Sequence, residues 1–161
     1  MKAALRRLTA GAVLASAIAL AAAATSSATG SIAVAGDVLP TSTNLTTRTA
    51  GDNLLFDGTG THAWAGSLTG TSVVDVHFVV HPSGVVTYQG VVTFTGTTPC
   101  GTGTVRLNAT GSGPFPGPLT GTSTTIDEGG ASVPLHAELD TVLFLTPAGA
   151  VLTYSGEAHC W

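Results

Sequence analysis

Charged side chains are scarce in this sequence, and positive ones most of all. Of 161 residues, five are Lys or Arg and nine are Asp or Glu. Three of the five basic residues lie within the first seven positions, so only Arg48 and Arg106 remain in the rest of the chain. Two positive side chains cannot neutralise a row of phosphates. The composition therefore argues against nucleic acid and anionic membrane surfaces as partners.

Sequence signatures of the common enzyme classes are also missing. No serine stands in a nucleophile-elbow context, and there is neither a phosphate-binding loop nor a closely spaced cysteine pair for a metal. The motifs consequently assign no catalytic residue, no metal ligand and no cofactor.

The first residues have the pattern of an exported leader. Lys2, Arg6 and Arg7 precede an apolar, Ala-rich run, and small residues follow it. We predict a signal peptide over 1–35, cleaved after Ala28 or Ala35, with Ala35 favoured. The alternative is a membrane anchor, but a run of about 17 mostly Ala residues is at the short limit for a span. Cleavage after Ala35 would leave one secreted, extracellular domain over 36–161, with nine acids against two arginines and a net charge of −7.

Only two cysteines are present, Cys100 and Cys160, and both lie in the predicted exported part. An even pair in an oxidising compartment most simply forms a disulfide. We therefore predict a bridge between them, which would hold the last strand of the domain in place.

Beyond the leader there is no helical period. Short runs of β-forming residues alternate with Gly, Pro, Ser and Asn, which is typical of an all-β sandwich or barrel. Each run has one apolar and one polar face, as an antiparallel sheet with a single core requires. The predicted strands are 43–49, 53–58, 61–69, 71–80, 85–95, 102–110, 118–125, 131–145 and 150–160, with 36–47 either a loose arm or part of a first strand.

A short motif occurs twice, as "SLTGTS" at 67–72 and "PLTGTS" at 118–123. Each copy is followed by a Pro-x-Gly turn and a Thr-Tyr-x-Gly strand, but the spacing between these parts differs between the two halves. A strict repeat architecture would keep its period. We interpret the motif as the beginning of a strand, with Leu68 and Leu119 in the core.

The segment from Trp64 to Gly113, "WAGSLTGTSVVDVHFVVHPSGVVTYQGVVTFTGTTPCGTGTVRLNATGSG", resembles a family of small, often secreted actinobacterial β-barrel proteins of unknown function. That family is similar in fold to the allene oxide cyclase and dirigent barrels. The preceding "TRTAGDNLLFDGTGT" at 47–61 fits the usual lead-in strand of that family, and the resemblance as a whole extends over about 100 residues, through turn and core positions. It favours an antiparallel barrel of about eight strands over a β-sandwich, and it implies no catalytic residue.

Three groups of polar residues are candidates for chemistry. Asp75, His77 and His81 share one strand face and could form an acid–base pair. The cluster His136, Glu138, Glu157 and His159 would lie together on an outer face, where two His and a carboxylate could hold a metal. An acidic loop, "IDEGG" at 126–130, could bind calcium. In each case a solvated surface is the more economical interpretation.

The apolar interior is the remaining candidate. Five aromatic residues fall on the inward parity and form the predicted ligand-binding set: Trp64, Phe78, Tyr88, Phe94 and Tyr154. We find no ionisable group on that parity, so the leading hypothesis is a non-enzymatic barrel. Its interior is either filled by its own side chains, which is the more economical interpretation, or hollow enough to bind a small hydrophobic molecule. The alternatives are a cyclase or isomerase acting on a hydrophobic substrate inside the barrel, and an extracellular interaction or inhibitor protein. The sequence does not specify an oligomeric state.

Overall fold

The computed structural model describes residues 30–126, 132–146 and 149–161, and these fold into eight β-strands. Most of the predicted leader and of the acidic loop at 126–130 lies outside the described residues. Within the described ranges, no helix is long and apolar enough to cross a membrane. The strands are β1 (Ile32–Ala50), β2 (Asn53–Gly66), β3 (Thr69–Val80), β4 (Val85–Thr98), β5 (Gly101–Pro114), β6 (Pro118–Thr125), β7 (Leu135–Thr146) and β8 (Gly149–Cys160).

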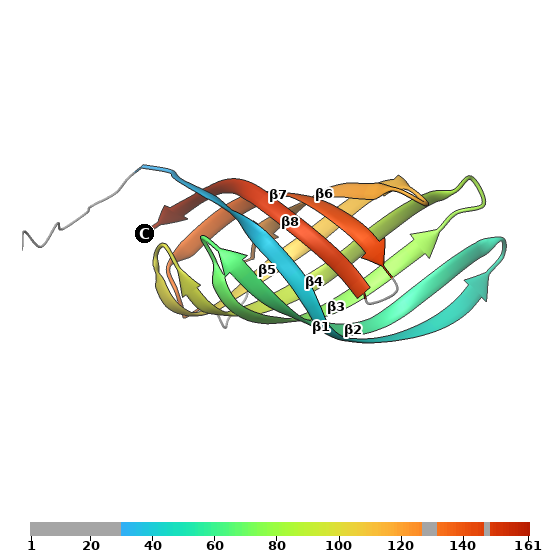
Figure 1. The fold of residues 1–161 in the computed structure, drawn as a ribbon, viewed down its shortest axis with the longest axis horizontal. Helices are drawn as coiled ribbons and strands as arrows, with labels where there is room; N and C mark the ends of the chain where they lie inside the picture. The colour runs from blue at the N-terminus through green and yellow to red at the C-terminus, as the bar shows by residue number, and fades with distance from the viewer. Residues whose placement is uncertain (1–29, 127–131, 147–148) are drawn as a thin grey trace, which may run out of the picture.

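Each strand pairs antiparallel with the next along the chain, and β8 pairs with β1 to close the barrel (Figure 1). The predicted all-β, eight-stranded antiparallel barrel is therefore confirmed, and the sandwich alternative is wrong. In an open sheet the first and last strands would each present an edge of unpaired backbone groups. Closing the barrel pairs these two strands with each other.

Several predicted strand boundaries differ from the observed ones, most of all at the beginning of the domain. The first strand begins at Ile32 rather than 43, inside the predicted leader, and its residues 36–47 are strand and not a loose arm. The predicted segments 53–58 and 61–69 form one strand, because Gly58 and Gly60 continue the ladder instead of breaking it. A Cβ at Gly58 would collide with the carbonyl of Asn44 on β1, so glycine at this position allows the two backbones to approach.

The first four residues of β1 are part of the barrel. Ile32 and Val34 pair with Ala158 and Gly156 of β8, and the Val34 side chain is buried in the core. The Ala35 N–H donates to the Ser67 Oγ at 3.0 Å, and the Ser67 N–H donates to the Ala35 carbonyl at 2.9 Å. The barrel thus begins before residue 36.

The seam between β1 and β8 is short. Their ladder runs from Ile32 to Val38 and ends there, while β1 continues with β2 as a hairpin that extends past β8 (Figure 1). Pro40 lies just beyond the last pair and has no N–H to donate, and the register with β2 shifts between Pro40 and Ser42. Such a bulge bends a strand. The two strands therefore separate along part of the barrel wall.

The core is divided into two hydrophobic clusters. The larger contains Trp64, Leu68, Phe94, Leu135 and Tyr154 and lies toward the end of the barrel where the chain terminates. The smaller contains Phe78, Val86, Tyr88, Leu119 and Leu143. The alternation predicted from the sequence places these side chains inside, because successive side chains of a strand face opposite sides.

The two "LTGTS" copies have equivalent environments. Leu68 and Leu119 are 1% and 0% exposed, which confirms their prediction as core residues. The serines that end the motifs, Ser72 and Ser123, also face inward and are 4% and 5% exposed. The motif therefore delivers a hydroxyl to the interior twice, in addition to beginning a strand.

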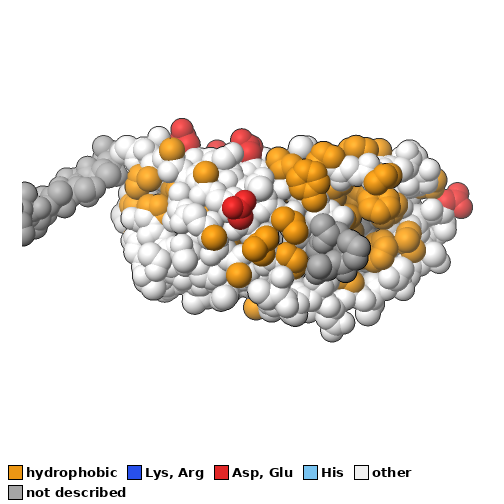
Figure 2. All heavy atoms as spheres, viewed as in Figure 1, with side chains coloured by type: hydrophobic (Ala, Val, Ile, Leu, Met, Phe, Trp, Pro, Cys, Tyr) orange, Lys and Arg blue, Asp and Glu red, His pale blue; other side chains and the backbone are white. Residues whose placement is uncertain are grey.

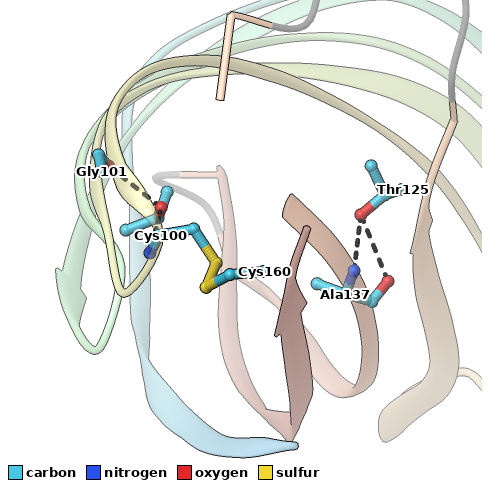
Figure 3. The surroundings of a disulfide bond; sticks show 6 residues. Cys100, Gly101, Thr125, Ala137 and Cys160 are labelled. Atoms are coloured by element: carbon cyan, nitrogen blue, oxygen red, sulfur yellow. Dashed lines mark hydrogen bonds between the residues drawn. A yellow bond between two sulfur atoms is a disulfide. The ribbon is translucent and has the colours of Figure 1, made fainter. Parts of the chain in front are cut away.

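The predicted disulfide is present. Cys100, in the turn between β4 and β5, is bonded to Cys160 at the end of β8, with their Cα atoms 5.4 Å apart (Figure 3). In the same region Thr125 Oγ1 accepts a hydrogen bond from the Ala137 N–H at 2.8 Å, so a side chain continues the pairing of β6 with β7 (Figure 3). The bridge ties the last strand to a turn that is distant in sequence.

Candidate functional site

An apolar cavity of about 170 Å³ lies in the barrel interior. Its walls include members of both core clusters, among them Trp64 and Val74 of one and Phe78 and Leu143 of the other. An enclosed apolar cavity of roughly 150 Å³ can bind a molecule the size of benzene. The interior is therefore large enough for one small ligand.

The cavity exists because several inward positions carry small side chains. Gly60, Gly90, Ala109 and Ala150 come from four different strands, and all line it. A barrel of eight strands has an interior that larger side chains at such positions would fill. The space thus follows from residue size rather than from a wide barrel.

Three of the five predicted ligand-binding residues line the cavity: Trp64, Phe78 and Tyr88. The other two, Phe94 and Tyr154, pack against Trp64, with ring centroids 5.3 and 5.2 Å from its own. They pack against the indole and hold it in place. The Tyr88 hydroxyl is hydrogen-bonded to Thr141 Oγ1 at 3.1 Å, and burial raises the pKa of this tyrosine.

An imidazole also lies on the cavity wall, contrary to the expectation from the sequence. His62 of β2 faces inward between Gly60 and Trp64, and burial lowers the pKa of its imidazole below the ordinary value of 6.5. At neutral pH the ring is therefore uncharged. Both residues lie within the predicted strand 61–69, two positions apart, so alternation alone already places His62 on the same face as Trp64, and the expectation of no ionisable group on that face is wrong.

Two serine hydroxyls share the cavity wall with His62. Ser72 lies directly across from His62, as its Cα partner on β3, and its Oγ accepts a hydrogen bond from Trp64 Nε1 at 2.9 Å. Ser123 reaches the cavity from β6. The interior therefore combines an apolar lining with a few hydrogen-bonding groups, which is the usual composition of a small-molecule site.

The separation of β1 from β8 gives the cavity an opening in the wall. Leu45 of β1 and Leu145 of β7 line it and are 37% and 36% exposed, so the lining reaches the surface there. Figure 2 shows hydrophobic side chains gathered on the face where β7 ends and β8 begins. Phe144, next in the chain to Leu145, is 47% exposed. An apolar surface therefore adjoins the opening.

A second, polar hollow lies on the outer face of β2–β5 and contains the predicted Asp75–His77 pair. The partner of His77 is not Asp75 but Asp57, its Cα partner on β2, which contacts His77 Nδ1 through Oδ1. Arg48 Nε donates to the other carboxylate oxygen at 3.0 Å. The hydrogen bond from His77, and then that from Arg48, lower the pKa of Asp57. A directly opposite residue is nearer than one two positions along the same strand, which explains the pairing.

The other polar candidates also lie on the surface. His81 Nδ1 is 3.1 Å from Asn53 Oδ1. His136 and His159 are cross-strand partners, as are Glu138 and Glu157, so the inferred register is confirmed. Among the residues that the structure describes, no three His, Cys, Asp or Glu side chains lie close enough together to hold a metal. Asp127 and Glu128 of the acidic loop are outside the described residues.

Comparison with known proteins adds no assignment. No protein-family model matches the sequence, and no match is found among the curated proteins. The resemblance to secreted actinobacterial barrels and to allene oxide cyclase-type barrels stays a prediction.

Proposed function

We propose that this protein is a secreted, non-enzymatic β-barrel that binds one small, mainly apolar molecule in its interior. The observation that supports it most directly is the apolar cavity of about 170 Å³ between the two core clusters. Trp64, Phe78 and Tyr88 supply aromatic walls for such a ligand, and the separation of β1 from β8 supplies its route.

Toluene is a suitable probe, because it is apolar and contains a single ring. We expect a titration followed by backbone amide chemical shifts to move signals from cavity-lining residues such as Val74 and Leu143. Filling the cavity with Ala109→Phe should abolish these shifts. The matched control, Ala63→Phe, adds the same ring at an exposed position outside the cavity and should preserve them.

Ala109→Phe must first be shown to fold, by its amide spectrum and thermal unfolding. A second filling variant, Ala150→Phe, tests the same cavity from β8. If wild-type protein shows no toluene-dependent shifts, or if both filling variants retain them, the proposal is wrong.

Secretion is the second part of the proposal. It is supported by the leader pattern and is compatible with the disulfide. We further propose cleavage after Ala28 instead of Ala35, because removal of Ile32–Ala35 would take Val34 out of the core and Ala35 away from Ser67.

One observation favours a second function, a cyclase or isomerase acting inside the barrel. His62 is an uncharged imidazole in an apolar cavity, which is a suitable setting for a general base. The probe is 5-nitrobenzisoxazole, in which loss of the ring C–H proton to a base breaks the N–O bond and releases a coloured cyanophenolate. An enzyme of this kind should accelerate the reaction and lose the acceleration on His62→Phe. Equal rates with both proteins, after correction for the buffer reaction, would reject this second function.

A further inference from the structure

We propose that the cavity is selective for a ligand with one hydroxyl group on an otherwise apolar body, and that His62 and Ser72 bind this hydroxyl. The inference rests on the proposed ligand-binding function and adds the chemical class of the ligand. Small phenols belong to this class, as do alcohols whose apolar part is about as large as one ring.

His62 supplies the first part of the subsite. It lies on the cavity wall, and its ring makes no hydrogen bond to any residue in the described ranges. A neutral imidazole has one N–H donor and one nitrogen acceptor. The ring nitrogens are not sealed in the protein, since the described residues contain no buried side-chain nitrogen or oxygen without a partner, so they are open to a ligand that supplies a hydrogen bond.

Ser72 supplies the second part. Its oxygen accepts from the indole of Trp64 at 2.9 Å, and because an indole N–H is only a donor, the serine O–H proton is left for another acceptor. As Ser72 and His62 are Cα partners on adjacent strands, a group that reaches one of them lies beside the other. The subsite thus combines a hydroxyl donor with an imidazole that both donates and accepts.

A ligand hydroxyl matches these groups because it also donates and accepts. An anionic ligand does not match, since the cavity lining contains no Lys, Arg, Asp or Glu among the described residues and the imidazole is uncharged at neutral pH. A purely apolar ligand would fill the space and leave the polar groups without partners. The arrangement therefore discriminates in favour of an uncharged hydroxyl.

The test compares p-cresol, toluene and p-toluate, which share a methyl-substituted ring and differ in the polar group. One additional hydrogen bond corresponds to a preference of about threefold to tenfold. We expect wild-type protein to bind p-cresol more tightly than toluene by this factor, and p-toluate most weakly. Dissociation constants come from amide chemical-shift titrations at neutral pH.

The decisive variant is His62→Phe, which should keep toluene binding and remove the preference for p-cresol. Ser72→Ala should reduce the preference. Thr71→Val, at the exposed neighbouring position of β3 outside the cavity lining, is the control and should preserve it. Because Ser72 also holds Trp64, Ser72→Thr is a second variant that keeps a hydroxyl in place.

The outcomes separate the two proposals. If toluene does not bind wild-type protein, the proposed function fails. If toluene binds but p-cresol binds no more tightly, or if His62→Phe keeps the preference, the function stands and the hydroxyl subsite is wrong.

Discussion

The Tyr154 hydroxyl accepts a hydrogen bond of 2.8 Å from the backbone N–H of Leu68, across 86 residues of sequence. It joins β8 to the turn between β2 and β3, at the first copy of the repeated motif. Leu68 is 1% exposed, so its N–H has no access to bulk water. A cap of this kind satisfies a backbone group where a turn interrupts the ladder of the sheet.

Tyr154→Phe should therefore destabilise the barrel by about 1–3 kcal/mol, because the Leu68 N–H would be buried without an acceptor. The free energy of unfolding from urea titration is the measurement. Thr153→Val, at the exposed neighbouring position, is the control and should change it by less than about 0.5 kcal/mol. Equal effects of the two substitutions would contradict the role given to the tyrosine hydroxyl.

Replacing both cysteines with serine should lower the free energy of unfolding by up to about 4 kcal/mol, because the bridge closes a loop of 60 residues in the unfolded chain. The matched comparison is wild-type protein whose disulfide is kept reduced during the same urea titration. Its free energy of unfolding should equal that of the double variant. A double variant as stable as the oxidised protein would show that the bridge contributes nothing.

The N-terminal residue of the secreted protein should be Thr29, as determined by mass spectrometry of protein from the culture medium. A chain that begins at Gly36 lacks the Val34 side chain, whose burial contributes about 1.5–3 kcal/mol, and the pairing of Ile32–Ala35 with β8. We expect it to unfold at lower urea than a chain that begins at Thr29. Identical midpoints for the two chains, or a mature protein that begins at Gly36, would contradict this prediction.

Acidification should destabilise the protein partly through His62. Its folded-state pKa is lowered by burial, so the unfolded chain binds more protons as pH falls below about 6.5. The free energy of unfolding should therefore be fully retained above that pH and decline below it, by at most about 1.4 kcal/mol per pH unit from this group. His62→Gln and His62→Phe should both make the pH dependence shallower. An unchanged slope in both variants would show that His62 is not responsible.

Much of the fold is contained in local sequence pattern. Strand 118–125 was predicted with its observed bounds. The inward positions of Phe78 and Tyr88 followed from alternation, and that of Leu119 from the repeated motif. The period of two is a property of each strand alone, so it needs no knowledge of the partners. The disulfide followed from the number of cysteines and their compartment.

Glycine was the main source of error. Glycine is common in turns, so Gly58 and Gly60 in the sequence suggest a break between two strands. In the barrel Gly58 provides space for the backbone of β1, and Gly60 leaves room beside the His62 ring. A glycine can either form a turn or leave space for the backbone or side chain of an adjacent strand. Which of the two it does depends on the adjacent strand, and the local sequence pattern does not say which strand that is.

Composition and alternation thus determined by themselves an all-β chain with an apolar inside, two paired cysteines and little positive charge. Only the tertiary structure decided that β1 leaves β8 after Val38, that His77 pairs with Asp57, and that His62 and Ser72 face each other beside a cavity. These are relations between strands, fixed by register and closure. They place residues distant in sequence within contact, and no single strand encodes them.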